Sequence, residues 1–237
     1  MSTPIAILAT GHTFDALRAR HGDFHDWIAA GLGPDVASVT LDVRAGAPLP
    51  EPRSLPGVVI TGSHDMVSDR APWSEALAAW LREAVAGGLP VLGICYGHQL
   101  LAHAFGGQVA DHPDGLELGT HAVHLSAAAA DDPLFSALPP SFDAHLVHRQ
   151  SVRTLPAGAQ LLAGNAHEPH QAFRLGRCAW GVQFHPEFGE TAMQAYVDAL
   201  APAHGIIPGP VRATPQAAAL LRRFAQLVRR LDGGASG

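Results

Sequence analysis

Short apolar runs in the first half of the chain alternate with segments of helical periodicity. The runs are rich in Val, Ile and Leu and are bounded by Gly, Pro or polar residues, which predicts buried strands. These strands cover residues 5–9, 36–43, 58–60 and 90–94. Helices are expected over residues 14–32 (irregular), 72–86 and 96–105. Buried strands alternating with helices indicate an α/β fold with a mostly parallel sheet covered on both faces.

The second half has a different pattern, in which β-like pieces follow one another without long helices between them. They predict antiparallel or mixed strands at one side of the sheet, over residues 121–125, 144–147, 160–163, 171–174 and 179–184. After Gly205 a Pro/Gly-rich connector leads to a helix over 214–231 and a tail over 233–237. The apolar stripe of this helix is expected to face the core; docking of a partner or a second subunit is the alternative. We therefore separate a domain over 1–204 from a connector, helix and tail over 205–237.

Composition narrows the class of protein. The formal charge is −6 without a basic run, which gives no sign of nucleic-acid binding. No apolar stretch is long enough to predict a membrane span, and the first residues lack the features of a signal peptide. With only two cysteines, a reducing cytoplasmic location is expected. All 15 basic residues are arginines, so a phosphate-binding loop lysine, a lysine Schiff base and a Ser-Lys dyad are excluded.

The most informative segment is the turn around Cys95. Residues 91–100 read as an apolar strand, then Gly-x-Cys-x-Gly, then a helix, which is the cysteine counterpart of a nucleophile elbow. Gly93 and Gly97 allow close approach of neighbouring backbone. At a helix N-terminus, Cys95 would be stabilised as a thiolate, and the free N–H groups there can bind an oxyanion. The alternative for Cys95 is a small buried residue at the end of a strand.

A second strand ends in polar residues at His185 and Glu187. A cysteine nucleophile needs an imidazole to take its proton, and that imidazole needs a third group to hold its tautomer. His185 and Glu187 flank Pro186, which stiffens the turn between them. In a chain with 15 histidines, His185 alone would be unremarkable; paired with the cysteine turn, it predicts a triad.

No metal site and no cofactor are predicted. Histidine pairs occur at 21/25, 121/124, 145/148 and 167/170, but none forms His-Glu-x-x-His. Neither cysteine belongs to a Cys-x-x-Cys pair, so solvated or hydrogen-bonded histidines are the better interpretation. Cys178 lies among apolar residues and is expected to serve packing alone.

The two polar turns resemble the motifs of the class I glutamine amidotransferases. Residues 93–99, Gly-Ile-Cys-Tyr-Gly-His-Gln, are similar to the nucleophile motif of that family, and residues 183–187, Gln-Phe-His-Pro-Glu, to its His-Pro-Glu motif. The wider resemblance runs from the first strand to about residue 200. It implies a flavodoxin-like, doubly wound α/β fold and a thioester mechanism that releases ammonia and glutamate from glutamine.

The resemblance also implies a role for individual residues. Cys95 would be the nucleophile, His185 the general acid and base, and Glu187 its orienting partner. The backbone N–H groups of Gly62 and Tyr96 would form the oxyanion hole. The residues expected to hold substrate are Gln99, Gly97, Gln150 and Ser151.

One departure leaves the substrate open. Residues 61–65, Thr-Gly-Ser-His-Asp, replace the Gly-Gly-Pro that is common in members serving nucleotide synthesis, and resemble stand-alone members and γ-glutamyl peptidases. The chain is therefore expected either to supply ammonia to a synthetase partner in trans or to hydrolyse γ-glutamyl peptides or conjugates. A cysteine hydrolase with histidine directly after the nucleophile is disfavoured, because Tyr96 occupies that position. A catalytically inactive regulatory relative remains the third alternative.

Overall fold

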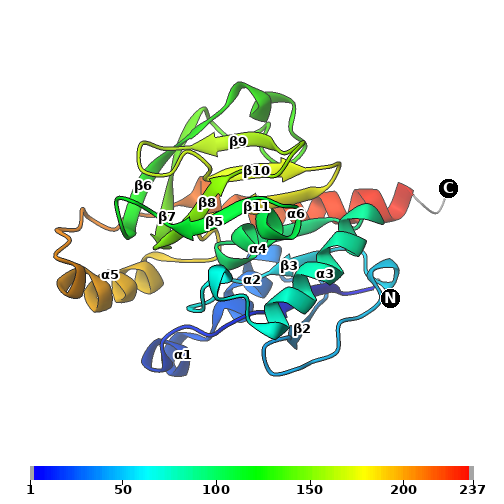
Figure 1. The fold of residues 1–237 in the computed structure, drawn as a ribbon, viewed down its shortest axis with the longest axis horizontal. Helices are drawn as coiled ribbons and strands as arrows, with labels where there is room; N and C mark the ends of the chain where they lie inside the picture. The colour runs from blue at the N-terminus through cyan, green and yellow to red at the C-terminus, as the bar shows by residue number, and fades with distance from the viewer. Residues whose placement is uncertain (1–2, 235–237) are drawn as a thin grey trace.

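A mixed sheet crosses the centre of the protein. In the computed structural model, which describes residues 3–234, this sheet has nine strands in the order β2-β1-β3-β4-β11-β10-β9-β6-β7 (Figure 1). The parallel half consists of β1 (Ile5–Ala9), β2 (Ser38–Asp42), β3 (Val58–Ile60), β4 (Val91–Ile94) and β11 (Ala179–Val182). Its order is that of a flavodoxin-like doubly wound sheet, so the predicted fold class is confirmed.

The other half of the sheet is antiparallel, as the second half of the sequence predicted. It consists of β10 (Ala172–Leu175), β9 (Gln160–Gly164), β6 (Glu117–Leu125) and β7 (Ser141–His148). Two further strands were not predicted, and they pair antiparallel in a separate small sheet: β5 (Gln108–Asp111) and β8 (Gln150–Thr154). Short 3-10 turns cover Pro52–Ser54, Val67–Asp69 and Ala127–Asp131.

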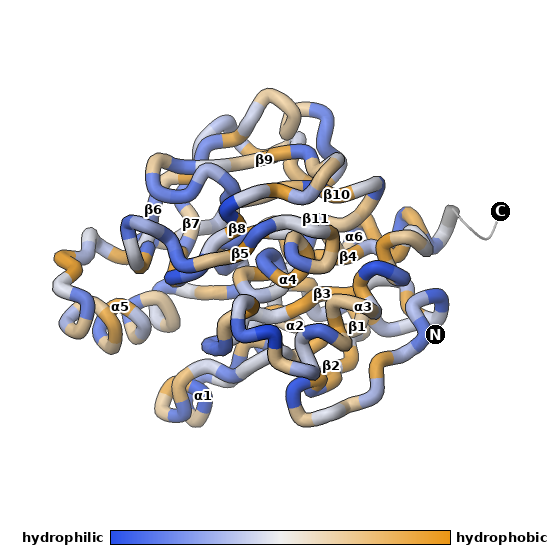
Figure 2. Tube along the Cα trace, viewed as in Figure 1, coloured by the Kyte–Doolittle hydropathy of each residue, from blue (hydrophilic) through white to orange (hydrophobic). Residues whose placement is uncertain are grey.

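Helices cover both faces of the sheet. On one face α3 (Pro72–Ala86) and α4 (Tyr96–Ala104) pack on β1, β3 and β4. On the other face α2 (Phe24–Leu32) packs against α6 (Pro215–Gly234). The strands between these layers include strongly hydrophobic segments, as the orange along β1 and β3 in Figure 2 shows. No helix within residues 3–234 is long and apolar enough to cross a membrane.

Two helices differ from the sequence-based prediction. The helix expected over residues 14–32 is interrupted: α1 (Asp15–His21) ends at Gly22, whose φ is 81°. Asp23 then caps α2 through its side chain, in a capping box with Asp26. Helix α5 (Glu190–His204) was not predicted; it contacts β6 and lies at one end of the molecule (Figure 1).

The C-terminal helix faces the core, as expected from its apolar stripe. Leu220 and Phe224 are fully buried, and the Phe224 ring packs edge-on against Trp180 at 6.5 Å between centroids. Leu231 departs from the expectation, because 42% of its surface is exposed. The tail predicted over 233–237 begins inside this helix, and residues 235–237 lie outside the described part of the chain.

We expect Phe224→Ala to lower the free energy of unfolding by about 3–5 kcal/mol, since it leaves a cavity between α6 and the sheet. Urea denaturation monitored by circular dichroism measures this change. Leu231→Ala on the same helix is the matched control, and its effect should stay below about 0.5 kcal/mol because the side chain is half exposed. Equal effects of the two substitutions would contradict the packing described for α6.

Candidate active site

The carboxyl ends of three neighbouring parallel strands form the candidate site. Gly62 follows β3, Cys95 follows β4 and His185 follows β11. These strands are adjacent in the sheet, so the three residues meet at the same edge. This edge is where open α/β sheets bind their ligands.

Cys95 lies on a strained turn between β4 and α4. Its φ of 49° and ψ of −94° lie in a region that non-glycine residues rarely adopt. Its backbone N–H donates to the Val182 carbonyl at 2.8 Å, which fixes the turn against β11. A Cβ at Gly93 would lie 2.4 Å from the Gly97 carbonyl oxygen, and one at Gly97 would lie 2.8 Å from that of Ile60. The two flanking glycines are therefore needed for the turn to close.

His185 is held in one orientation by contacts on several sides. Its Nδ1–H donates to Oε1 of Glu187 at 2.8 Å, and its backbone N–H donates to the His145 carbonyl at 2.8 Å. The ring stacks on Phe188 with centroids 4.1 Å apart. Its Nε2 is buried and has no hydrogen-bond partner within residues 3–234. One ring nitrogen is thus fixed by a carboxylate and the other is free for a proton-transfer partner.

The environment of His185 favours its protonated form. Burial lowers its pKa, but the charges of Glu187 and Cys95 outweigh burial and raise the pKa from 6.5 to about 10. The folded protein therefore keeps a proton that the unfolded chain loses above pH 6.5. This contribution to stability is fully present below pH 6.5 and is lost as the pH rises through 10.

We accordingly expect the free energy of unfolding to fall between pH 6.5 and 10 more steeply in wild type than in Glu187→Gln. Urea denaturation across this range measures both slopes. Glu190→Gln, which neutralises an exposed carboxylate at the start of α5, is the matched control and should keep the wild-type slope. A wild-type slope in Glu187→Gln would show that this carboxylate does not hold the proton on His185.

Backbone N–H groups near Cys95 suit an oxyanion. Tyr96 is the first residue of α4, and the first N–H groups of a helix have no intrahelical acceptor. A Cβ built at Gly62 would lie 3.1 Å from Cε1 of His185 and 3.8 Å from Cβ of Cys95, so the Gly62 backbone faces both side chains. The turns after β3 and β4 thus bring the Gly62 backbone and the start of α4 next to the side chains of Cys95 and His185.

A cavity of about 230 Å³ opens over Cys95 and His185. Among the residues expected to bind substrate, Gln99 and Gln150 line this cavity, whereas Gly97 and Ser151 do not. Tyr96, which was expected in the oxyanion hole, also lines it.

The side chains of Gln99 and Gln150 are already bonded to protein groups. The Gln99 amide donates to the Gln150 carbonyl at 2.7 Å and to Oε1 of Gln183 at 3.0 Å. The Gln150 amide donates to Ser68 Oγ at 2.7 Å and to Asp111 at 2.9 Å. Both glutamine side chains therefore connect segments of the chain around the cavity through hydrogen bonds.

Several cavity residues were not among those that the sequence pointed to. Tyr196, Leu200 and His204 come from α5, the helix that was not predicted, and their spacing of four residues is the signal that identifies this face. The Tyr196 hydroxyl bonds the His64 ring at 2.8 Å. Burial and the nearby charge of His185 lower the pKa of His64, so this cavity histidine favours its neutral form.

Both apolar and polar residues line the cavity. The apolar ones are Phe14, Phe24, Met66, Leu116, Val147, Tyr196 and Leu200. The polar ones include Gln99, His148, Arg149 and Gln150. A ligand with both a polar and an apolar part fits this lining.

Comparison with known proteins agrees with the motifs and the fold. The family model described as Glutamine amidotransferase class-I matches residues 36–199. The chain is 38% identical over 141 residues to "GMP synthase [glutamine-hydrolyzing]" of Thermomicrobium roseum, an alignment that covers 60% of this chain and 25% of that protein. It is 32% identical over 138 residues to "Gamma-glutamyl-L-1-hydroxyisopropylamide hydrolase" of a Pseudomonas species, covering 55% of this chain and 46% of that protein.

The likeness extends to solved structures. A glutamine amido transferase from Methylobacillus flagellatus superposes with a TM-score of 0.76 at 25% identity, over 99% of this chain and 96% of that one. The family model and the superposition together define an α/β protein of the amidotransferase type. The chain belongs to the class I glutamine amidotransferase family. It spans about a quarter of the length of the GMP synthases that it matches.

Proposed function

We propose that the chain hydrolyses the γ-amide of glutamine through a thioester on Cys95 and releases ammonia and glutamate. The observation that carries the proposal is the arrangement around one cavity. Cys95 lies on an elbow that lines the cavity, His185 Nε2 has no hydrogen-bond partner within residues 3–234, and Glu187 holds the opposite ring nitrogen at 2.8 Å. These are the three parts that covalent catalysis by cysteine requires.

The first half-reaction forms the thioester. The Cys95 sulfur attacks the γ-carbonyl carbon, and the developing oxyanion is bound by the N–H groups of Gly62 and Tyr96. His185, which already holds the proton taken from the thiol, delivers it to the leaving nitrogen, so that ammonia departs and the γ-glutamyl group stays on sulfur. Glu187 stabilises the imidazolium between these steps.

The second half-reaction restores the thiol. Water donates a proton to Nε2 of His185 and attacks the thioester carbon, and the same N–H groups hold the second oxyanion. The carbon–sulfur bond breaks, His185 returns the proton to the sulfur, and glutamate leaves. No cofactor takes part in either half-reaction.

The polar residues of the cavity lining are suited to the amino-acid end of the substrate. They include Gln99 and Gln150, and Arg149 adds a positive charge. We assign substrate binding to these residues and to the backbone near Gly97 and Ser151. The amidotransferase domain is assigned to residues 1–204. By analogy with the GMP synthase relatives, a synthetase acting in trans would receive the ammonia.

The test measures ammonia and glutamate produced from glutamine by the purified chain alone. Equal amounts of both products, formed at a rate proportional to protein concentration, would support the proposal. A folded protein that releases neither would contradict it and favour the inactive regulatory alternative.

A second candidate function is hydrolysis of γ-glutamyl amides with a larger leaving group. The apolar residues of the cavity lining favour it, because ammonia needs no such surface, and a relative is named as a γ-glutamyl amide hydrolase. In this version the leaving amine lies against Tyr196 and Leu200.

Substrate preference separates the two candidates. If the second holds, γ-glutamylethylamide will have a higher kcat/KM than glutamine, and Leu200→Asp will lower kcat/KM for the ethylamide alone by about tenfold, the value of losing one or two buried methylene contacts. An equal loss of kcat/KM for both substrates would show that Leu200 does not contact the leaving group. A preference for glutamine would leave ammonia supply as the function.

A further inference from the structure

Two loops next to the active-site cavity bring a second group of polar side chains together. His112 and Asp114 follow β5, and His167 lies in the loop between β9 and β10. The His112 backbone N–H donates to the Arg149 carbonyl at 2.8 Å, and Arg149 and Leu116 line the cavity. The first loop is therefore part of the cavity wall.

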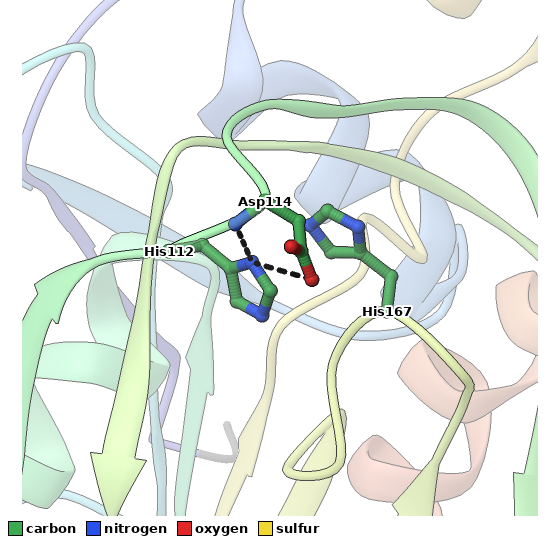
Figure 3. Close-up of side chains that lie close together, drawn as sticks. All are labelled: His112, Asp114 and His167. Carbon is green, nitrogen blue, oxygen red and sulfur yellow. Dashed lines mark hydrogen bonds and ion pairs between the residues drawn. The ribbon is translucent and has the colours of Figure 1, made fainter.

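The three side chains present metal-binding atoms to one another. One ligand atom from each of His112, Asp114 and His167 lies within 4.8 Å of the other two. His112 Nδ1 is 4.0 Å from Oδ2 of Asp114. Figure 3 shows the Asp114 carboxylate close to the two imidazole rings, which stack with their centroids 4.1 Å apart. Two nitrogens and a carboxylate oxygen form a donor set suited to zinc.

The local environment leaves both histidines available as ligands. The His112 side chain is only 3% exposed. Nε2 of His167 is buried and has no hydrogen-bond partner within residues 3–234. A buried ring nitrogen without a partner needs an explanation, and a bound ion would supply one.

We propose that His112, Asp114 and His167 bind a zinc ion, with a fourth position open to water. Zinc–nitrogen bonds of about 2.0–2.1 Å place tetrahedral ligands roughly 3.3 Å apart, so the ligand atoms move together by about 1 Å on binding. The rings leave their stack, because the nitrogen lone pairs lie in the ring planes. The Asp114 N–H, which donates to His112 Nδ1 at 3.1 Å, gives up that bond to the ion.

The ion would add a second link between the two loops, next to the contacts that the buried Glu117 makes. That carboxylate accepts from His148 Nε2 at 2.8 Å, from Asn165 at 2.6 Å and from Gln171 at 2.9 Å. Glu117 thus already connects the His167 loop to His148, a cavity residue. Zinc would fix the loops that carry His112 and His167. Substrate would then bind to a cavity wall that is already ordered.

The binding experiment is a calorimetric titration of zinc into the full chain carrying Cys95→Ala. This substitution removes the cavity thiol, which would otherwise compete for zinc. One zinc ion per chain is expected. Adding His112→Ala, His167→Ala or Asp114→Asn should weaken binding by more than about 100-fold, because losing a group that only orients a ligand already costs about 10–100-fold.

The matched control adds His124→Ala, which removes an exposed histidine of β6 and should leave zinc affinity unchanged. Asp114 is 75% exposed, so Asp114→Asn reports on the site even if a histidine variant fails to fold. No zinc binding to Cys95→Ala, or equal affinity in all variants, would overturn the proposal.

The coupling to the cavity rests on the proposed function and is tested separately. Glutamine is titrated into Cys95→Ala with and without zinc. Zinc should tighten glutamine binding, glutamine should tighten zinc binding by the same factor, and both effects should disappear in Asp114→Asn. Unchanged glutamine affinity would refute the coupling. Absence of glutamine binding would refute the proposed function, while the zinc titration would still decide the metal site.

Discussion

Glutamate release from glutamine is expected to fall by at least about 10⁴-fold, to background, when Cys95 is replaced with alanine. The thioester cannot form without the sulfur, and neither His185 nor the oxyanion hole can replace it as nucleophile. The side chain is small and lies at the edge of the cavity, so its loss should leave the fold intact. A coupled glutamate assay measures the change.

Cys178→Ala is the matched control for this prediction. The Cys178 sulfur contacts the Gly88 carbonyl at 3.1 Å at the opposite end of β4, and burial raises the pKa of its thiol. It should therefore keep near-wild-type activity. Turnover that survives in Cys95→Ala but not in Cys178→Ala would place the nucleophile elsewhere.

A second large effect is expected for His185→Gln. Loss of the general acid and base should lower kcat by about 10²–10⁴-fold. The change in KM should be small, because His185 transfers a proton during the reaction and does not hold the bound amino acid. The glutamine side chain fills part of the space on Phe188 and limits the loss of packing.

His204→Gln provides the comparison, since His204 lines the same cavity from the end of α5 but is exposed. Its kcat should change less than about threefold, as for surface substitutions. If His204→Gln had the larger effect, proton transfer would have to be reassigned to α5.

The sequence predicted those parts of the site that are formed by residues close together in the chain. The turn around Cys95 needs small residues on both sides because neighbouring carbonyls lie within 2.4–2.8 Å of where a Cβ would be. That constraint appears in the sequence as Gly-x-Cys-x-Gly. His185 and Glu187 lie two residues apart, so their contact is also local. The predicted strands place both turns at the same edge of the sheet.

The missed elements depend on distant contacts. Helix α5 has a weak apolar pattern and contains Pro202, and its inner face is defined by the cavity and by β6. Within residues 3–234, strands β5 and β8 pair with each other alone, and β6 and β7 lie between them in the sequence. The His112–His167 contact joins two loops, whereas the histidine pairs in the sequence are local, so the sequence did not predict that these side chains lie together.

The most direct test of the account is to look for the covalent intermediate. Wild-type protein is mixed with glutamine, quenched in acid within one turnover, digested and analysed by mass spectrometry, with Cys95→Ala treated in parallel. The account predicts one γ-glutamyl group on the peptide that contains Cys95, removed by hydroxylamine as a thioester should be, and none on the Cys178 peptide. Glutamate formation without any acylated Cys95 peptide, at a quench time when product is accumulating, would contradict the mechanism.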